Sequence, residues 1–436
     1  MKHFAIIGSG ISGLTAAYLL SKKHKVTVFE KNDSVGGHTA TVDIEKSGDK
    51  FAIDTGFIVF NDRTYPNFLA LLDEIGIGKI PTEMSFSVHN CQSGLEYNGH
   101  NLDTLFAQRR NIFKPTFWLL VKEILRFNKL CKSIYQQDTY IDGLTLGAFL
   151  TEHNFSDFFA EHYILPMGAA IWSSSLAQME DFEFTFFVKF FHNHGLLNIA
   201  DRPQWYVIPK GSRSYLTPLC APFKDNINVK ANITSITRSN DKVHLHFEDT
   251  PSQTFDEVVI ACHSDQALSL LNDASQDEKS VLSAMPYSAN TVVLHTDEKL
   301  LPKRKKAWAS WNYQLNHNRG NNTSHDRSHN RSAAASVTYN MNILQGIQSK
   351  HTFCVTLNQK DDIDPKEILR EFTYHHPVFS ADSIKAQQQR HIICGVNHTH
   401  FAGAYWHSGF HEDGVRSAVE VAERFDCYIG VTDEHA

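Results

Sequence analysis

The chain has 436 residues, of which 42% are apolar and 20% charged, and its 41 Lys and Arg against 48 Asp and Glu give a formal charge of −7. This balance excludes a disordered chain, a collagen and a coiled coil. The acidic total argues against nucleic acid as a partner, because phosphate binding needs a basic face. The length predicts two or three domains.

The sequence contains no long uninterrupted apolar run, so it predicts no transmembrane helix. Strand-like sequence begins at Lys2 and leaves no room for a signal peptide, which predicts a cytoplasmic protein. Seven scattered cysteines form no Cys-x-x-Cys pair. We therefore expect neither a disulfide framework nor a thiolate metal site.

The first forty residues follow a strand, loop, helix and strand order. Residues 2–7 form an apolar run of strand length, residues 8–13 read Gly-Ser-Gly-Ile-Ser-Gly, and residues 14–20 have the composition of a helix. A second strand at residues 25–29 is followed by Glu30. This order is typical of a dinucleotide-binding unit, whereas an isolated glycine pattern could be a surface turn.

Each part of this unit has a physical role. Gly8 permits the tight turn, Gly10 lets a pyrophosphate approach the backbone, and Gly13 lets the helix pack on the strand. Glu30 would accept hydrogen bonds from ribose hydroxyls and repel a 2′-phosphate, so FAD and NAD remain while NADP is disfavoured. The predicted contacts of this unit are Gly8, Gly10, Ile11, Ser12, Gly13, Glu30 and Lys31.

The following residues favour FAD over NAD. Val-Gly-Gly-His-Thr at residues 35–39 and Phe-Ala-Ile-Asp-Thr-Gly-Phe at residues 51–57 resemble the superfamily of FAD-dependent amine oxidases and phytoene desaturases. That resemblance implies that the glycine pair lies against the FAD pyrophosphate and that the second segment passes the flavin. His38 stands where the family usually has Arg, which weakens or changes that phosphate contact. The implied contacts are Gly36, Gly37, His38, Thr39, Gly56, Phe57 and Ile58.

Residues 401–419 resemble the closing flavin motif of the same superfamily. The resemblance implies that Gly403 and Ala404 contact the ribityl phosphate and that Gly409, Phe410 and His411 line the flavin ring. Ala404 replaces an acid common among relatives, and Glu412 or Asp413 could substitute for it. His411 and Glu412 are also the catalytic candidates. The alternative is a glycine-rich surface turn before an ordinary helix.

The middle of the chain supplies a third expected part. Residues 228–233 and 243–247 alternate like an antiparallel hairpin, and residues 255–262 resemble a buried parallel strand. The resemblance implies that Ile233 contacts the adenine through its backbone. The predicted fold class is therefore α/β, with a Rossmann-type FAD-binding domain and an inserted α+β substrate domain. The expected FAD domain covers 1–75, 205–270 and 395–436, and the substrate domain covers 76–204 and 271–394.

Segments 166–172, 193–197, 308–313 and 409–414 resemble one branch of that superfamily. Its members are described as predicted NAD/FAD-binding oxidoreductases, often occur beside cyclopropane fatty acid synthases, and resemble the N-terminal part of the plant synthases. Some are thought to desaturate methyl-branched acyl chains. The branch implies a lipid or acyl-chain substrate and a lipid methyltransferase partner.

Residues 105–132 carry seven basic side chains against one acid, Glu123. Apolar residues recur there at helical spacing, with Lys122, Arg126 and Lys129 on another face. Such a helix can lie on an anionic membrane, here the inner membrane surface, but it can equally be an ordinary helix with a solvated basic face. Both interpretations stay open.

Six phenylalanines in residues 182–191 could line an acyl tunnel or simply form core. The histidine-rich stretch 316–332 is polar, reads as a surface loop and shows no metal-ligand spacing, so no metal is expected.

The resemblance implies that a substrate carbon gives a hydride to flavin N5. Amine oxidases usually place a lysine near N5, and the corresponding strand at residues 288–295 carries Asn290 or Thr291 there. We therefore expect an FAD-dependent oxidoreductase that dehydrogenates an acyl chain. The alternatives are an amine oxidase and a flavoprotein without turnover that assists a lipid methyltransferase.

Overall fold

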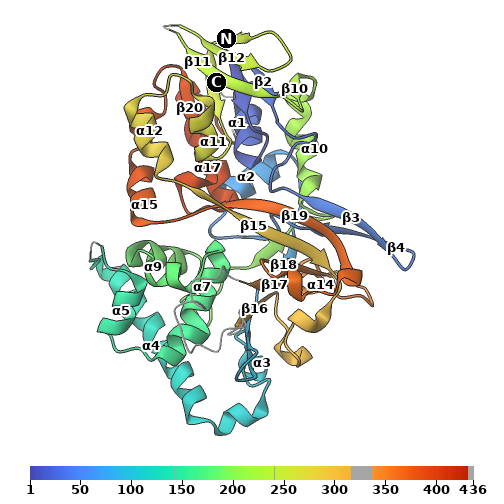
Figure 1. The fold of residues 1–436 in the computed structure, drawn as a ribbon, viewed down its shortest axis with the longest axis vertical. Helices are drawn as coiled ribbons and strands as arrows, with labels where there is room; N and C mark the ends of the chain where they lie inside the picture. The colour runs from blue at the N-terminus through green and yellow to red at the C-terminus, as the bar shows by residue number, and fades with distance from the viewer. Residues whose placement is uncertain (142, 240, 316–335, 431–436) are drawn as a thin grey trace.

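The computed structural model describes residues 1–141, 143–239, 241–315 and 336–430. A five-stranded parallel sheet has the order β10-β2-β1-β14-β20. Its strands are β1 (His3–Ile7), β2 (Lys25–Phe29), β10 (Ile227–Asn228), β14 (Glu257–Ile260) and β20 (Thr399–Phe401). All three segments predicted for the FAD domain thus supply strands to one sheet. It occupies the upper part of Figure 1 together with α1 (Ile11–Ser21) and α17 (His411–Ala422).

The apolar β1 and the mostly buried α1 explain why this sheet forms. Side chains of β1 and α1 share one apolar core with those of β2, β14 and α17. A three-stranded sheet lies beside it, formed by β11 (Ile233–Arg238), β12 (Val243–Phe247) and β13 (Gln253–Phe255). The predicted strand at residues 228–233 is wrong in extent. Lys230 has a φ of +55° and turns the chain there, so β10 joins the parallel sheet and the antiparallel pair begins at Ile233.

A seven-stranded mixed sheet forms the base of the second half, with the order β19-β15-β18-β17-β16-β7-β8. Its strands are β7 (Phe86–Asn90), β8 (Leu95–Asn98), β15 (Tyr287–His295), β16 (Trp311–Leu315), β17 (Val337–Asn340), β18 (Cys354–Leu357) and β19 (Ile368–Pro377). The helices beside it are α3 (Leu102–Leu105), α4 (Pro115–Gln137), α5 (Leu146–Glu152), α6 (Asp157–Phe159), α7 (Leu165–Trp172), α8 (Leu176–Glu180) and α9 (Phe184–Asn193). Their buried faces share a second apolar core with β7, β8 and β16.

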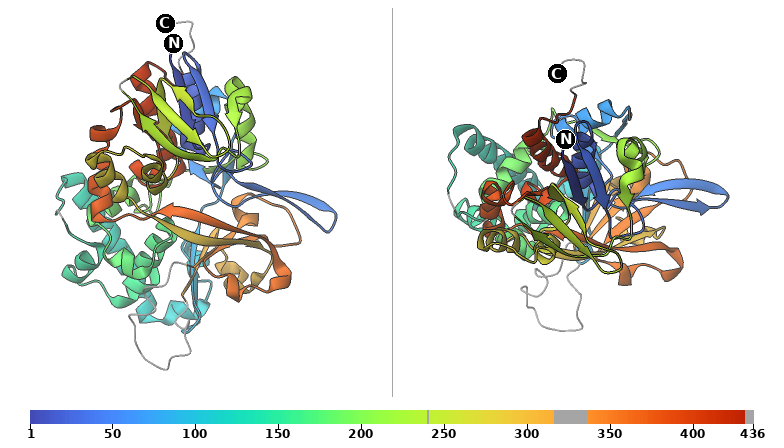
Figure 2. Two further views of the ribbon diagram at one scale, coloured as in Figure 1. Left: turned by 45° about the horizontal axis from the view of Figure 1, so that its top comes forward. Right: turned by 90° about the horizontal axis from the view of Figure 1, so that it is seen from above.

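Short elements connect the two halves. The hairpin of β3 (Thr41–Lys46) and β4 (Asp49–Asp54) stands away from the body in Figures 1 and 2. A small sheet joins β5 (Phe60–Asn61), β9 (Trp205–Val207) and β6 (Ile80–Thr82), and α2 (Pro66–Glu74) lies against α17. The remaining helices are α10 (Leu216–Cys220), α11 (Ser264–Leu270), α12 (Gln276–Ser283), α14 (Met341–Leu344), α15 (Ala381–Gln388) and α16 (Arg390–Ile393).

The core of the parallel sheet extends past the predicted boundaries at residues 270 and 395. Val281 and Leu282 of α12, Ala386 of α15 and Ile393 of α16 are buried in that core. These helices therefore pack with the first half, although the prediction placed them in the substrate domain. Within the described ranges, none of the helices has the length and apolar character needed to cross a bilayer. The polar stretch 316–332 falls outside the described residues.

Candidate functional site

The glycine loop between β1 and α1 leaves an open face at Gly10. A Cβ built on Gly10 would meet no atom within 4 Å, whereas one on Gly13 would lie 2.0 Å from the carbonyl oxygen of Gly8. Gly13 is therefore required for the packing of helix against strand. Gly10 precedes the first turn of α1, where unpaired N–H groups and the positive end of the helix dipole favour an anion.

The second glycine pair lies directly over this loop. The N–H of Gly36 donates to the carbonyl oxygen of Ser9 at 3.0 Å, and a Cβ on Gly37 would lie 3.2 Å from the Cα of Gly10. His38 accepts through its carbonyl oxygen from the N–H of Phe57 at 2.7 Å. The two segments predicted to pass the cofactor are thus in contact with each other and with the first loop.

The C-terminal segment reaches the same place. A Cβ on Gly414 of α17 would lie 2.8 Å from Cγ2 of Ile11 and 2.9 Å from Oγ of Ser12, so the first turns of α1 and α17 are in contact. Gly409 donates its N–H to the carbonyl oxygen of Ala404 at 3.2 Å, just before α17 begins. Two helix N-termini therefore meet beside the open face of Gly10, an arrangement suited to a phosphate group.

Glu30 lies at the end of β2 and is buried. Its carboxylate accepts from the N–H and hydroxyl of Ser9 at 2.9 and 2.6 Å, and from the N–H and side-chain amide of Asn32 at 2.8 and 2.9 Å. These four donors hold the acid beside the glycine loop, and a ribose hydroxyl would have to displace or share one of them. Lys31 next to it is exposed.

Ile233, the predicted adenine contact, lies near this acid. The carbonyl oxygen of Glu30 accepts from the N–H of Ala231 at 2.8 Å, and Ile233 donates its own N–H to the carbonyl oxygen of Ala231 at 3.0 Å. Ile58, by contrast, is buried in a separate apolar core with side chains of β3, β4, β15 and β18. Its side chain is a core residue, although its segment is close to the site.

His38 carries a buried nitrogen that has no partner, its Nε2. The ring lies 5.0 Å from Tyr374 and 5.5 Å from His376, both on β19. Burial, reinforced by the neighbouring His376, His263 and His375, lowers the pKa of His38 to about 3, so the ring is neutral near pH 7. A neutral imidazole can donate a hydrogen bond to a phosphate but cannot supply the charge of an arginine.

The imidazole of His411 lies inside the wall of the site. It stacks on Phe57, its Nε2 is 2.8 Å from the hydroxyl of Tyr215, and that hydroxyl is in turn hydrogen-bonded to Thr39. Burial holds the pKa of His411 well below its usual value near 6.5. This side chain is a neutral, fully engaged group that holds two segments together, and nothing in its geometry points to acid–base chemistry.

Glu412 and Asp413 are both occupied at helix ends. Glu412 accepts from the backbone and side chain of Asn67 at 3.0 and 2.7 Å and from the N–H of Phe68 at 2.8 Å, and thereby caps α2. Burial raises the pKa of Glu412 to about 7. Asp413 accepts from the N–H of Phe410 at 2.8 Å and caps α17. Glu412 therefore anchors α2, and neither acid is free to replace the one missing at Ala404.

A set of aromatic rings lies where α9 meets Phe379 and Phe410, and only some of its members were identified from the sequence. Phe410 stacks on Phe190 of α9 with centroids 5.0 Å apart and lies 5.8 Å from His194. Phe186 of α9 stacks on Phe379 at 5.5 Å. Phe379 was missed because it lies just beyond β19, far from every motif. Neighbouring β19 carries Phe372, Tyr374 and His376 at alternating positions, a signal that could have marked one face of this strand.

The strand on which the resemblance predicts the family's lysine position is β15. Its Asn290 is buried, donates to Nδ1 of His376 at 3.2 Å, and accepts from the side chain of Asn358 at 2.8 Å. Thr291 is exposed on the opposite side of the strand. Asn290 is therefore the residue that faces the histidines near the cofactor loops. Among the residues that the structure describes, no group of three or more His, Cys, Asp or Glu is arranged to hold a metal ion.

These segments fit a dinucleotide: an uncrowded glycine, two adjacent helix N-termini and an unpartnered imidazole nitrogen lie together. The model of the family described as flavin containing amine oxidoreductase matches residues 11–375. Residue contacts with the cofactor, taken one by one, remain predictions.

Two relatives share local similarity with the chain. A 1-hydroxycarotenoid 3,4-desaturase of Flavobacterium sp. (strain P99-3) is 53% identical over 169 residues, 34% of this chain and 33% of that protein. An L-amino-acid oxidase of Bungarus fasciatus is 46% identical over 48 residues, 11% of this chain and 9% of that protein. The matches thus span about a tenth to a third of these relatives.

Solved structures share the whole fold. Cyclohexylamine oxidase from Brevibacterium oxydans IH-35A superposes with a TM-score of 0.67 at 14% identity, covering 98% of this chain and 99% of that one. A fatty acid isomerase from P. acnes that produces CLA gives 0.66 at 17% identity, covering 97% and 98%. These likenesses confirm the predicted Rossmann-type FAD-binding fold. The chain belongs to the family of flavin-containing amine oxidoreductases and is an FAD-dependent oxidoreductase.

Proposed function

We propose that this protein removes two hydrogens from a carbon–carbon bond of a lipid acyl chain. The segments 36–39 and 403–410, which are expected to contact the cofactor, are called the flavin-side loops. The observation that carries the proposal is that the side chains packed around these loops are uncharged. They are aromatic rings or neutral polar groups: Phe186, Phe190, His194, Asn290, His376, Phe379 and Phe410. An apolar chain can be buried against such a wall without leaving a charge unpaired.

The histidines in this group carry no charge near neutral pH. Burial lowers the pKa of His194 to about 4 and that of His376 to about 4. Asn290, one of the two residues expected at the position of the family's lysine, is uncharged and contacts His376. A site for an amine commonly needs an anion or a basic residue to manage the ammonium proton, and these residues supply neither. An uncharged substrate is favoured instead.

Helix α9 has one face in the helical core and another beside Phe379 and Phe410. Phe184, Phe187 and Phe191 are buried in the helical core, while Phe186 and Phe190 contact Phe379 and Phe410 beside the flavin loop. The helix therefore fixes the position of the flavin-side rings through its core contacts. Rings held in this way can orient a flexible chain and exclude water.

FAD, when bound, supplies the acceptor for the hydride that leaves the substrate carbon. The protein residues would hold the chain and keep the site dry. The names of two relatives support this class of reaction: the 1-hydroxycarotenoid 3,4-desaturase and the 4,4′-diapophytoene desaturase of Staphylococcus aureus (strain MRSA252), the latter 23% identical over 189 residues. Among the solved structures, the fatty acid isomerase is named for an acyl substrate.

The test is anaerobic incubation of the FAD-loaded protein with phospholipids that carry branched or cyclopropanated acyl chains. We expect loss of the oxidised flavin absorbance and lipid products lighter by two hydrogens in mass spectrometry. A flavin that stays oxidised, with lipid recovered unchanged in the presence of several electron acceptors, contradicts the proposal. A Phe186→Ala variant, which shortens the aromatic wall without touching the glycine loops, should bind FAD normally and react more slowly.

Amine oxidation is the second candidate, favoured by paired aromatic rings and by the amine oxidases of the same fold. Phe410 and His194 form one such pair near the flavin loop. Amine-dependent release of hydrogen peroxide would support it. A flavin that neither lipids nor amines reduce, in a protein that co-purifies with a lipid methyltransferase, would favour the role of a partner without turnover.

A further inference from the structure

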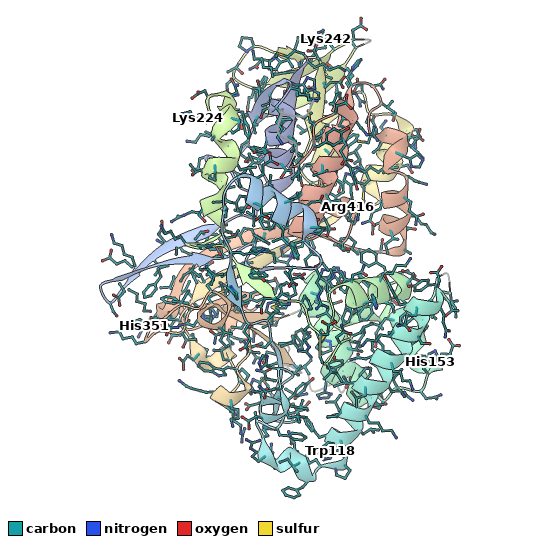
Figure 3. The ribbon with its side chains drawn as sticks, turned by 180° about the vertical axis from the view of Figure 1, so that it is seen from behind. Trp118, His153, Lys224, Lys242, His351 and Arg416 are labelled. Atoms are coloured by element: carbon teal, nitrogen blue, oxygen red, sulfur yellow. The ribbon has the colours of Figure 1, made fainter. Side chains whose placement is uncertain are left out.

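One end of the molecule presents large apolar side chains to solvent. We define the tip as residues 102–122, which include α3, the short helical turn Arg109–Phe113 and the first turns of α4. Phe113 is 86% exposed, Leu102 is 74% exposed and Trp118 is 49% exposed. Figure 3 shows Trp118 at the end of the molecule opposite Lys224 and Lys242. Exposed apolar residues scattered singly are ordinary, but several in one protruding segment indicate a contact surface.

The tip differs from the amphipathic helix that the sequence suggests. The apolar stripe of α4, which includes Phe117, Leu120, Phe127 and Cys131, is buried in the helical core. That stripe is not free to enter a membrane, so the expected mode of membrane contact is wrong for these residues. The outward face of α4 instead alternates apolar and basic side chains: Trp118, Leu119, Lys122, Leu125 and Lys129.

The exposed charge at the tip is positive because the nearby acids are either buried or ion-paired. Glu123, the single acid of residues 105–132, is buried, and its carboxylate accepts from the N–H and hydroxyl of Ser156 at 2.9 and 2.5 Å. Asp103 pairs with Arg109 and with Lys306, the latter at 2.7 Å. Arg110, Lys114 and Lys122 remain exposed on a chain whose total charge is negative.

The half-exposed indole of Trp118 is held in place rather than free to collapse. The indole N–H of Trp118 donates to the carbonyl oxygen of Ile112 at 2.8 Å, and the ring lies 5.2 Å from Phe106. Pro115 begins α4 directly after Lys114, which fixes the turn that carries Phe113. A rigid surface loses little conformational entropy when it binds.

From these observations we propose that the tip docks on an anionic lipid bilayer. Phe113, Leu102 and Trp118 would enter the interfacial layer, and Arg110, Lys114 and Lys122 would contact lipid phosphates. Charge complementarity identifies the bilayer as the occupant, since apolar side chains flanked by exposed basic groups match a surface with acyl chains beneath negative headgroups. The proposal concerns binding alone and does not depend on the substrate.

The test is flotation of the full-length, FAD-loaded protein with vesicles of phosphatidylcholine alone or mixed with phosphatidylglycerol. We expect binding only to the mixed vesicles, weakened by salt. Phe113→Ser should abolish most of it, and Lys114→Glu should lower the partition coefficient about fivefold or more. Ile199→Ser, at a position that is 67% exposed elsewhere, and Lys224→Glu, at the opposite end, are matched controls that should bind normally.

Three results would overturn the proposal. Absence of binding to mixed vesicles is the first, and equal binding by wild type and Phe113→Ser is the second. The third is a concentration-dependent dimer, detected without lipid, that Phe113→Ser dissociates, because the tip would then contact a second copy. Flotation needs no turnover, so failure of the acyl-chain reaction and failure of membrane docking are separately visible.

Discussion

The imidazole of His411 lies flat on the phenyl ring of Phe57, with the ring centroids 3.6 Å apart and the planes 7° apart. The same imidazole contacts the hydroxyl of Tyr215, which is hydrogen-bonded to Thr39. This relationship ties the first turn of α17 to the two segments that follow the second glycine pair. The geometry of the cofactor site therefore depends on side chains buried behind it.

Removing the Tyr215 hydroxyl should loosen this connection without creating a cavity. Tyr215→Phe keeps the buried ring and loses both hydrogen bonds, and the imidazole nitrogen of His411 is then left unpaired. We expect a loss of about 1–3 kcal/mol in the free energy of unfolding and faster release of FAD. Chemical denaturation and the rise of free flavin fluorescence measure the two effects. Tyr428→Phe, at an exposed position, is the control and should change neither quantity.

The two glycines of the first loop should respond differently to alanine. In Gly10→Ala the new Cβ meets no protein atom, so the protein should fold with nearly unchanged stability but bind FAD at least about tenfold more weakly, because the methyl group occupies the approach of the pyrophosphate. In Gly13→Ala the Cβ collides with the backbone of Gly8, so folding itself should fail. Titration calorimetry with FAD and circular dichroism separate the outcomes. Normal FAD affinity in Gly10→Ala would place the pyrophosphate elsewhere.

Buried histidines should make the protein sensitive to mild acid. Burial lowers the pKa of His38 to about 3 and those of His194, His295 and His376 to about 4, whereas the unfolded values lie near 6.5. Below pH 6.5 these histidines bind protons in the unfolded chain but stay neutral in the folded chain. The free energy of unfolding therefore falls as pH drops. Each such histidine contributes about 1.4 kcal/mol per pH unit between these values.

Urea denaturation between pH 4.5 and 7.5 measures this dependence. His295→Gln replaces a buried ring that contacts Thr356 at 2.7 Å and should reduce the slope below pH 6 by about one histidine's contribution. His391→Gln is a suitable control, because that residue is exposed. A slope identical in wild type and His295→Gln would contradict a neutral buried His295.

Glu412 should affect stability in the opposite direction with pH. Its folded pKa of about 7 lies above the ordinary 4.5, so the folded state resists ionisation and the contribution of this residue declines as pH rises from about 4.5 to 7. Glu412→Ala removes the cap of α2 and should cost about 1–2 kcal/mol at pH 5 and less at pH 8. Exposed Glu423→Ala should cost little at either pH. Equal losses at both pH values would mean that Glu412 titrates normally.

The elements of the cofactor half could be predicted because their signals are local. The strand, glycine loop and helix at residues 3–21 are contiguous, and Gly13 is required by the backbone of Gly8, five residues away. The direction in which a side chain points at the start of a helix is not determined by the neighbouring sequence. His411 turns toward Phe57 and Glu412 toward α2 because of packing partners far away in the sequence.

The same limit applies to domain edges and to helix faces. α12 and α15 pack on the parallel sheet through buried residues such as Val281 and Ala386, and no composition change marks that attachment. For α4 the periodicity revealed an apolar face, but it could not say whether protein or membrane covers it. Phe113, the most exposed large side chain of the tip, lies outside that periodic stripe in the turn before the helix.

The contact between Gly414 and the first turn of α1 also bears on how the protein is made. α1 leaves the ribosome long before α17. Until α17 has been synthesised, the apolar side of α1 therefore lacks the helix that will cover it, and the two helix N-termini cannot meet. Nascent chains halted before α17 should remain chaperone clients and should not retain FAD, so loading of the cofactor has to follow the synthesis of α17.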